Sequence, residues 1–270
     1  MQRSGSGWFE TLLNSHINVS SNGEIFSVYG RRSNFSAIEK TLDQVYNLDW
    51  LTSASKNECS AAVGFKWMLN QPYTDPYANT KGLCANGYIM VPAYVPRLPL
   101  HGVMTYHEEI VEYFNRRGVS VIFLFRRNLL RRLISVLANS YDRQAKVLNG
   151  THKSHVHSPD EAHILAQFKP NVTTETLTSD LKLVEDSTAN ILEYFRSTRH
   201  IILFYEDLMN NRTKLMDVQD FLKVPLMRLV SRQVKIHTRP LSEQVSNWDD
   251  VSKTLMGTQY ERFLHSDYKL

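Results

Sequence analysis

The segment Val119–Phe125 constrains the fold more than any other stretch of this sequence. It is rich in β-branched, aliphatic and aromatic residues, which is typical of a buried parallel strand. Helical periodicity precedes it over His101–Arg117, with a stop at Gly118, and follows it over Leu129–Tyr141. A helix, a strand and a helix in succession favour an α/β fold with a central parallel sheet flanked by helices.

The same pattern recurs in the C-terminal half. A second buried strand is predicted over Arg199–Tyr205, after a helix over Ser179–Phe195 and before a helix that ends near Phe221–Pro225. The chain has 270 residues, of which 42% are hydrophobic, with no repeat or low-complexity tract. We therefore expect one globular domain over residues 1–270.

The first hundred residues give weaker signals. We expect a short strand over His16–Val19 and an amphipathic helix over Ser36–Asn47. The apolar run 61–69 predicts a buried strand that runs into a helix, and 71–99 reads as a long connection. Lys66 interrupts that apolar run, either extending from a strand end to solvent or pointing into a ligand cleft.

The chain opens on a Gly- and Ser-rich turn, Gln2–Gly7, followed by helical spacing from Trp8 to Leu13. Small residues let backbone N–H groups curl around an anion, and a helix N-terminus adds partial positive charge. Arg3 supplies a cation for the same anion, so we predict a phosphate cradle; the alternative is a plain glycine turn before a surface helix. Trp8 stands where the Walker A motif needs Lys, which disfavours an NTPase or a kinase.

A second anion site is predicted where the first strong strand ends. Ligands of parallel sheets bind beyond the carboxyl ends of the strands. Arg127 lies at that position, and Ser135 follows eight residues later along the predicted helix. Both could hold one phosphate, with the guanidinium contacting two oxygens. The alternative for the arginines at 126, 127, 131 and 132 is a solvated basic start of the helix, although cations there oppose the helix dipole.

Three other groups of polar residues are candidates for the site. Glu24 follows an Asn-Gly turn and precedes apolar residues, so it is either a general base of raised pKa or a solvated turn residue. The histidines at 152, 155, 157 and 163 suit a loop over a cleft better than a metal site, because no Cys or carboxylate cluster completes a ligand set. Lys235, His237 and Arg239 either close over a nucleotide or pack along the domain edge.

The net charge is small, and the sequence gives only weak indications of the cellular compartment. A net charge of +4 suits anionic ligands but is too small for a nucleic-acid-binding surface. No apolar run reaches the roughly 18 residues that a membrane span needs, and no signal peptide is visible. Glycosylation sequons begin at Asn18, Asn34, Asn149, Asn171 and Asn211. Cys59 and Cys84 would pair in an oxidising lumen and stay thiols in cytosol.

Taken in order, these motifs resemble the sulfotransferase superfamily that uses 3′-phosphoadenosine 5′-phosphosulfate. They are the Arg3–Trp8 loop, the Gly23–Phe26 segment, Phe125–Ser135, Phe204–Leu208 and Phe221–Pro225. The resemblance is greatest to the branch that includes bacterial nodulation-factor and Golgi carbohydrate sulfotransferases and similar plant proteins. It covers nearly the whole chain and implies a three-layer fold of the P-loop type.

The resemblance also implies residue roles. Arg3 would contact the 5′-phosphosulfate, and Ser4, Gly5, Ser6, Gly7 and Trp8 would form the cofactor loop around it. Arg127 and Ser135 would hold the 3′-phosphate, and Glu24 would be the catalytic base for a hydroxyl of a carbohydrate-like acceptor. Lys66 and His157 have no firm counterpart. No metal is implied, because fixed cations do the work of Mg²⁺.

One departure concerns the N-terminus. In the family a strand runs directly into the position of Arg3, whereas here Met1 falls in the loop, so the resemblance implies that the first strand is missing and that the chain is truncated. Golgi relatives carry a membrane anchor and work in the Golgi lumen, and this chain has no anchor segment. The competing interpretation is an inactive nucleotide-binding or scaffolding remnant of the same fold.

Overall fold

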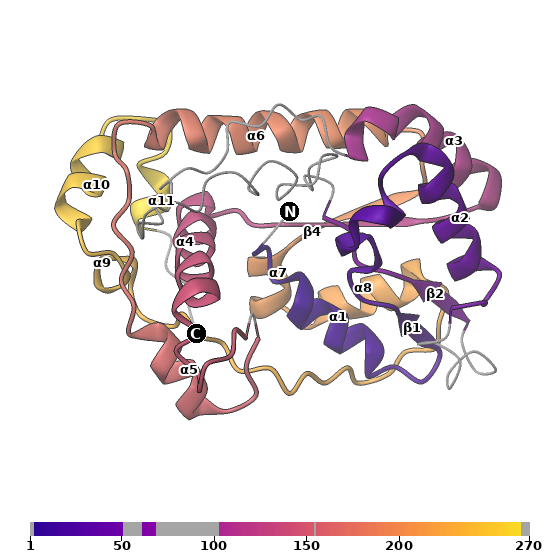
Figure 1. Ribbon diagram of the computed structural model, residues 1–270, viewed down its shortest axis with the longest axis horizontal. Helices are drawn as coiled ribbons and strands as arrows, with labels where there is room; N and C mark the ends of the chain where they lie inside the picture. Colours follow the sequence, from indigo (N-terminus) through magenta and orange to yellow (C-terminus); the bar gives the residue numbers. More distant parts are fainter. Residues whose placement is uncertain (1–2, 51–60, 69–102, 154, 266–270) are drawn as a thin grey trace, which may run out of the picture.

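The computed structural model describes residues 3–50, 61–68, 103–153 and 155–265. Cys59, Cys84 and the connection 71–99 lie outside these residues, so the expectations for them stay untested. Within the described part, short strands lie among a larger number of helices (Figure 1). The strands described form two parallel pairs, an arrangement compatible with the expected α/β class.

The longer of the two strand pairs lies near the middle of the molecule (Figure 1). It joins β3 (Val121–Phe125) to β4 (His200–Phe204), with Val121 opposite His200 and Phe125 opposite Phe204. Both predicted strands are thus confirmed. The expectation that the second strand is buried holds only in part, because Ile202 is 41% exposed whereas Leu203 is 4% exposed. Successive side chains of a strand point to opposite faces, and one face of β4 is only partly covered.

Helices cover both faces of this strand pair. On one face Leu124 and Leu203 pack with Phe9 and Leu12. The elements there are α1 (Ser6–Asn14), α7 (Tyr205–Asn210) and α8 (Thr213–Phe221). On the other face Phe123 and Phe125 pack against a larger apolar cluster. Its helices are α2 (Phe35–Tyr46), α3 (His107–Arg117) and α6 (Leu177–Tyr194).

The helix α4 (Leu129–Ala145) follows β3 after a short turn and carries much of the site. The Asn128 side chain caps it by accepting a hydrogen bond from Arg131 N at 3.0 Å, and donates to the Phe263 carbonyl at 2.9 Å. Those contacts fix the start of α4 against the C-terminal segment. The predicted helix is confirmed and is four residues longer than expected.

The C-terminal segment contains more helix than its sequence predicts. The elements are α9 (Leu241–Gln244), α10 (Trp248–Leu255) and α11 (Arg262–His265), and they pack with α4 and α6. Earlier in the chain α5 (Pro159–Ala166) is capped by the Ser158 hydroxyl. Helices this short hold too few turns for a periodic pattern to stand out. The short 3-10 turns are Ile25–Ser27, Tyr29–Arg31 and Val103–Tyr106.

The smaller strand pair corrects two expectations. It joins β1 (Val19–Ser21) to β2 (Ala62–Gly64). The first strand was expected over His16–Val19, so it begins at the residue where it was predicted to end. Residues 65–68, which directly follow β2, are not helical. Trp67 there stacks on Phe26 with ring centroids 4.2 Å apart, because this aromatic run covers the apolar cluster instead. Among the described helices, none is long and apolar enough to cross a membrane.

Candidate functional site

The loop 3–7 before α1 is held in an unusual backbone conformation. Arg3 has φ 62° and Gly5 has φ 83°, and a Cβ added to Gly5 would stand 2.2 Å from Cδ2 of Tyr205. Gly5 is the N-cap of α1 and offers no side-chain oxygen to the first N–H groups of the helix. Tight packing by Tyr205 therefore shapes this loop, and Gly5 leaves the start of α1 without a side-chain cap from its N-cap residue.

Arg3 is partly buried and joins this loop to α4. Its Nε donates to Ser135 Oγ at 2.9 Å, and its guanidinium also donates to Asn139 Oδ1 at 3.4 Å. Burial, and then the charge of Arg126, lower the pKa of Arg3 to about 10. The structure thus brings together two residues of the predicted cofactor site that are 132 positions apart.

Arg3 belongs to a group of partly or fully buried bases, which we call the cationic cluster. Its other members are Arg126, Arg131, Arg132 and Lys235. Burial first, and then neighbouring cations, lower the pKa of Lys235 to about 8. The same causes lower the pKa of Arg132 to about 10 and that of the adjacent His237 to about 4. Like charges that suppress one another's protonation mark a place suited to an anion.

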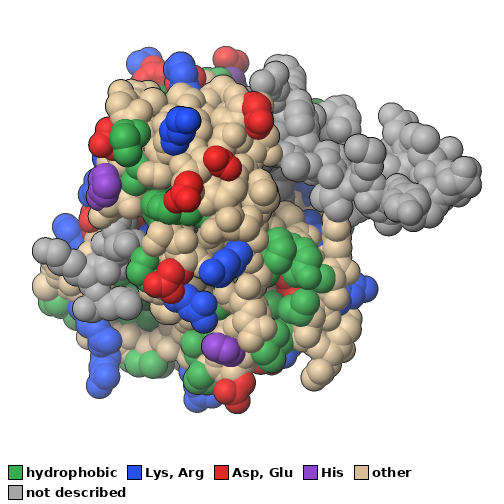
Figure 2. Space-filling model, turned by 90° about the vertical axis from the view of Figure 1, so that its left-hand side faces the viewer, with side chains coloured by type: hydrophobic (Ala, Val, Ile, Leu, Met, Phe, Trp, Pro, Cys, Tyr) green, Lys and Arg blue, Asp and Glu red, His purple; other side chains and the backbone are tan. Residues whose placement is uncertain are grey.

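Nearby carboxylates neutralise the positive charge of the cationic cluster only in part. Glu206 lies 3.9 Å from Arg126 Nε and also accepts hydrogen bonds from the backbone N–H groups of Arg127 and Asn128. Arg132 Nε is buried and has no hydrogen-bond partner among the described residues. One face of the molecule shows Lys and Arg interspersed with Asp and Glu (Figure 2). On that face, therefore, the charges are mixed rather than gathered by sign.

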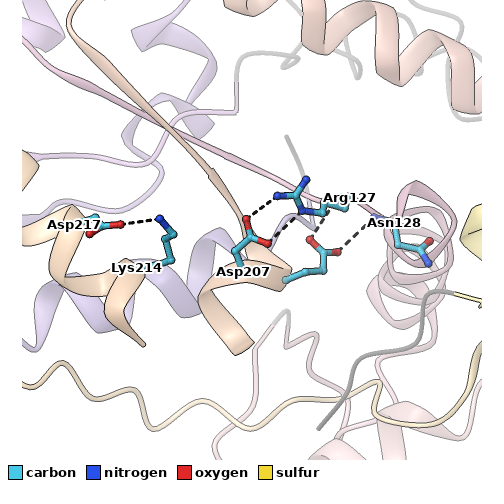
Figure 3. Close-up of polar contacts among 6 residues, drawn as sticks. Arg127, Asn128, Asp207, Lys214 and Asp217 are labelled. Carbon is cyan, nitrogen blue, oxygen red and sulfur yellow. Dashed lines mark hydrogen bonds and ion pairs between the residues drawn. The ribbon is translucent and has the colours of Figure 1, made fainter. Parts of the chain in front are cut away.

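Arg127 takes a different direction from its neighbours. It is about half exposed and makes a two-pronged ion pair with Asp207, at 2.7 and 3.2 Å (Figure 3). The carboxylate raises the pKa of Arg127, and its guanidinium stacks on Phe204 at 3.9 Å. The structure does not bring Arg127 and Ser135 into contact, because Ser135 faces Arg3 on the buried side of α4.

Glu24 lies in a separate network of charged side chains. Lys66 Nζ is 2.9 Å from Glu24 Oε1 and 3.5 Å from Glu10 Oε2, and the Lys66 side chain is 14% exposed. Ser21 Oγ donates to the other Glu10 oxygen at 2.8 Å. Lys66 thus joins the carboxylates of Glu24 and Glu10 instead of extending to solvent, and a ligand cleft beside it stays a prediction.

His155 connects the two groups. A Cβ on Gly7 would be 2.1 Å from its Nε2, so the imidazole lies directly against the loop before α1. Burial, then the charges of Arg3 and Lys66, lower its pKa to about 4. His155 is therefore neutral at pH 7 and sits between a cationic and an acidic neighbourhood. The sequence gives no reason to single it out from the three nearby histidines; His157 instead contacts the Arg232 carbonyl.

A cavity of about 350 Å³ opens beside Arg3. It runs along α4 past Asn139 and Asp142, and its opposite wall comes from α5 and from His237. Within the described residues, no three His, Cys, Asp or Glu side chains are grouped so as to hold a metal ion. The site thus combines buried cations, a held carboxylate and an adjoining cavity.

The chain is similar to Nodulation protein H from Rhizobium meliloti. They are 26% identical over 266 residues, which cover 97% of this chain and 92% of the relative. Nodulation protein H of R. meliloti strain 1021 gives the same identity and coverage. No protein-family model matches the chain, and no solved structure matches it. The similarity is distant but extends over nearly the whole of both proteins.

The position of Gly5 yields a first prediction. Gly5→Ala should lower the free energy of unfolding by about 1–3 kcal/mol, since alanine is strained at this φ and its Cβ would displace Tyr205. Urea denaturation measures this. Gly30→Ala is the matched control, because a Cβ there meets nothing within 4 Å. Equal effects of the two substitutions would contradict the packing described.

His237 yields a second prediction, on pH dependence. Its pKa is about 4 in the folded protein and about 6.5 when unfolded, so between these values the unfolded state binds more protons. Stability should therefore fall as pH is lowered from 6.5 to 4. His237→Gln should make that slope shallower by up to about 1.4 kcal/mol per pH unit. Urea titrations across this range test it, with exposed His163→Gln as the control; an unchanged slope for His237→Gln contradicts it.

Proposed function

We propose that this protein is a sulfotransferase that moves the sulfuryl group of 3′-phosphoadenosine 5′-phosphosulfate to a hydroxyl of a carbohydrate-like acceptor. The observation that carries the proposal is the cationic cluster beside the loop 3–7. Burying several cations together is costly, and a polyanion bound among them would offset that cost. The full-length similarity to Nodulation protein H supports it, since the branch that the motifs resemble includes nodulation-factor sulfotransferases.

The donor would lie across the start of α1 and α4. The loop residues Ser4–Trp8 would give backbone N–H groups to the 5′-phosphosulfate, with Arg3 as its cation. Arg127 and Ser135 would hold the 3′-phosphate, which requires Arg127 to leave Asp207 and turn toward Ser135; phosphate oxygens accept the same two-pronged contact as the carboxylate. The proposed domain covers residues 1–270 and has the three-layer arrangement of P-loop proteins.

The reaction needs an in-line displacement at sulfur. The acceptor oxygen forms a bond to sulfur, the bond from sulfur to the 5′-phosphate oxygen breaks, and the hydroxyl proton goes to Glu24. Lys66 would hold the Glu24 carboxylate in place, while Arg3 and the loop amides would stabilise charge on the departing phosphate. His155, neutral between them, would leave the carboxylate as the proton acceptor.

Binding of the donor product gives a third prediction. Adenosine 3′,5′-bisphosphate should raise the Tm by several degrees, since saturation at about 100 Kd adds about 2.7 kcal/mol to stability. Arg127→Ala should abolish the shift. Arg196→Ala is the control, because Arg196 is also a surface arginine paired with a carboxylate, Glu193. Absence of a shift in the unmodified protein would overturn the proposed donor.

The role of Glu24 gives a fourth prediction. Glu24→Gln keeps the size of the side chain but removes the base, so transfer of ³⁵S-labelled sulfuryl groups should fall at least about 100-fold. The Tm shift with adenosine 3′,5′-bisphosphate should stay. Glu39→Gln, which removes another ion-paired carboxylate, should leave transfer unchanged. A protein that binds the nucleotide but transfers nothing in any form would instead be a non-catalytic remnant of the fold.

A further inference from the structure

The side chain of Arg127 is held away from the residue with which it would bind the 3′-phosphate. Its Nε and Nη2 donate to the two carboxylate oxygens of Asp207, at 3.2 and 2.7 Å (Figure 3). The guanidinium also stacks on Phe204, 3.9 Å from the ring centroid. Ser135 instead accepts a hydrogen bond from Arg3 on the buried side of α4. The Arg127 side chain is therefore bound to the end of β4 and the start of α7, and not to α4.

Two consecutive carboxylates of α7 divide the contacts to this segment. Glu206 accepts hydrogen bonds from the backbone N–H groups of Arg127 and Asn128, at 3.0 and 3.4 Å, and so fixes the main chain between β3 and α4. Asp207 accepts from the guanidinium. Because different residues hold the main chain and the side chain, the guanidinium can leave Asp207 while the backbone of Arg127 stays in place.

Asp207 occupies the contact that a phosphate needs. A guanidinium binds a phosphate best through two parallel N–H groups, and Asp207 takes such a pair of N–H groups of Arg127. The carboxylate and a phosphate are both anions, so each disfavours the other at this position. The two side chains are 55% and 39% exposed, and ion pairs this open to solvent are weak enough for a phosphate to displace the carboxylate.

Asp207 keeps a cationic neighbour when Arg127 leaves it. Lys214 lies at the start of α8, with its Nζ 2.9 Å from Asp217 Oδ2 (Figure 3). Its hydrogen bond to Asp217 raises the pKa of Lys214, and the charge of Asp207 raises it further. The carboxylate of Asp207 thus remains solvated and close to a positive charge, which lowers the cost of releasing Arg127.

We propose that Asp207 limits the affinity of this site for nucleotides with a 3′-phosphate by competing with that phosphate for Arg127. This inference rests on the proposed function and deepens it. The 3′-phosphate displaces Asp207, and Arg127 turns from α7 toward Ser135. As the bisphosphate product leaves, Asp207 binds Arg127 again, which favours release of the product. Asp207 is a positioning residue, because it acts through Arg127 and not on the ligand.

Calorimetric titration with two nucleotides tests the competition without turnover. Adenosine 3′,5′-bisphosphate and adenosine 5′-monophosphate differ only in the 3′-phosphate. Asp207→Asn keeps the shape of the side chain, and it should tighten binding of the bisphosphate on the order of fivefold, as expected for loss of an exposed ion pair, and that of the monophosphate by less than about twofold. Asp207→Ser should give the same gain. Asp186→Asn, which removes another exposed carboxylate with a lysine partner, should change neither affinity.

The Arg127→Ala background separates competition from a general effect of charge. There, Asp207→Asn should restore no binding of the bisphosphate, because no guanidinium remains to be released. A gain that needs Arg127 and the 3′-phosphate supports the inference. An unchanged or weaker affinity of both Asp207 variants for the bisphosphate, an equal gain for the monophosphate, or restored binding in the double variant overturns it.

The same titrations separate this inference from the proposed function. If the unmodified protein binds the bisphosphate and the Asp207 variants bind it no more tightly, only the competition is removed. If neither the unmodified protein nor the Asp207 variants bind the bisphosphate, the proposed donor is removed and the inference with it.

Discussion

The site depends on one long-range interaction, the contact of the partly buried Arg3 guanidinium with Ser135 and Asn139. It ties the loop before α1 to the middle of α4 across more than 130 residues of chain. The guanidinium stays charged there although burial and Arg126 lower its pKa to about 10. The Arg3 guanidinium holds the loop before α1 and the middle of α4 in a fixed position relative to each other, despite the cost of desolvating its charge. An anion bound between the loop and α4 would strengthen this contact.

Sequence reasoning predicted the elements whose signals are local. The run Val121–Phe125 and the helix after it are specified by composition and periodicity, and both are found in place. The short helices α9–α11 were not predicted, because helices of four to eight residues are stabilised by packing against α4 and α6 and not by the periodicity of their own sequence. Residues 65–68 were expected to be helical, but their aromatic side chains pack on Phe26 and its neighbours.

For the site, sequence reasoning identified residue types better than partners. Arg3, Ser135 and Glu24 were singled out, and the structure places Arg3 on Ser135. Arg127 was expected beside Ser135, yet a carboxylate on a different element, Asp207, contacts it, and no local pattern reports that pairing. Asp142 was missed, and His155 was not distinguished from the neighbouring histidines, for the same reason. Their distinction lies in what surrounds them: the Gly7 backbone for His155, and His152 with a cavity for Asp142.

Charge is separated in a way that suits group transfer between oxygens. Positive side chains gather where α1 and α4 begin, while Glu24 and Glu10 share Lys66 on the side of β1 and β2. In the proposed transfer, a departing phosphate would gain from the first environment and a hydroxyl proton would be drawn to the second, so the two would have to stay apart. His155 lies between them and, with a pKa near 4, adds no charge to either. Protonating His155 would place a cation beside the Lys66–Glu24 pair and weaken the carboxylate as a base.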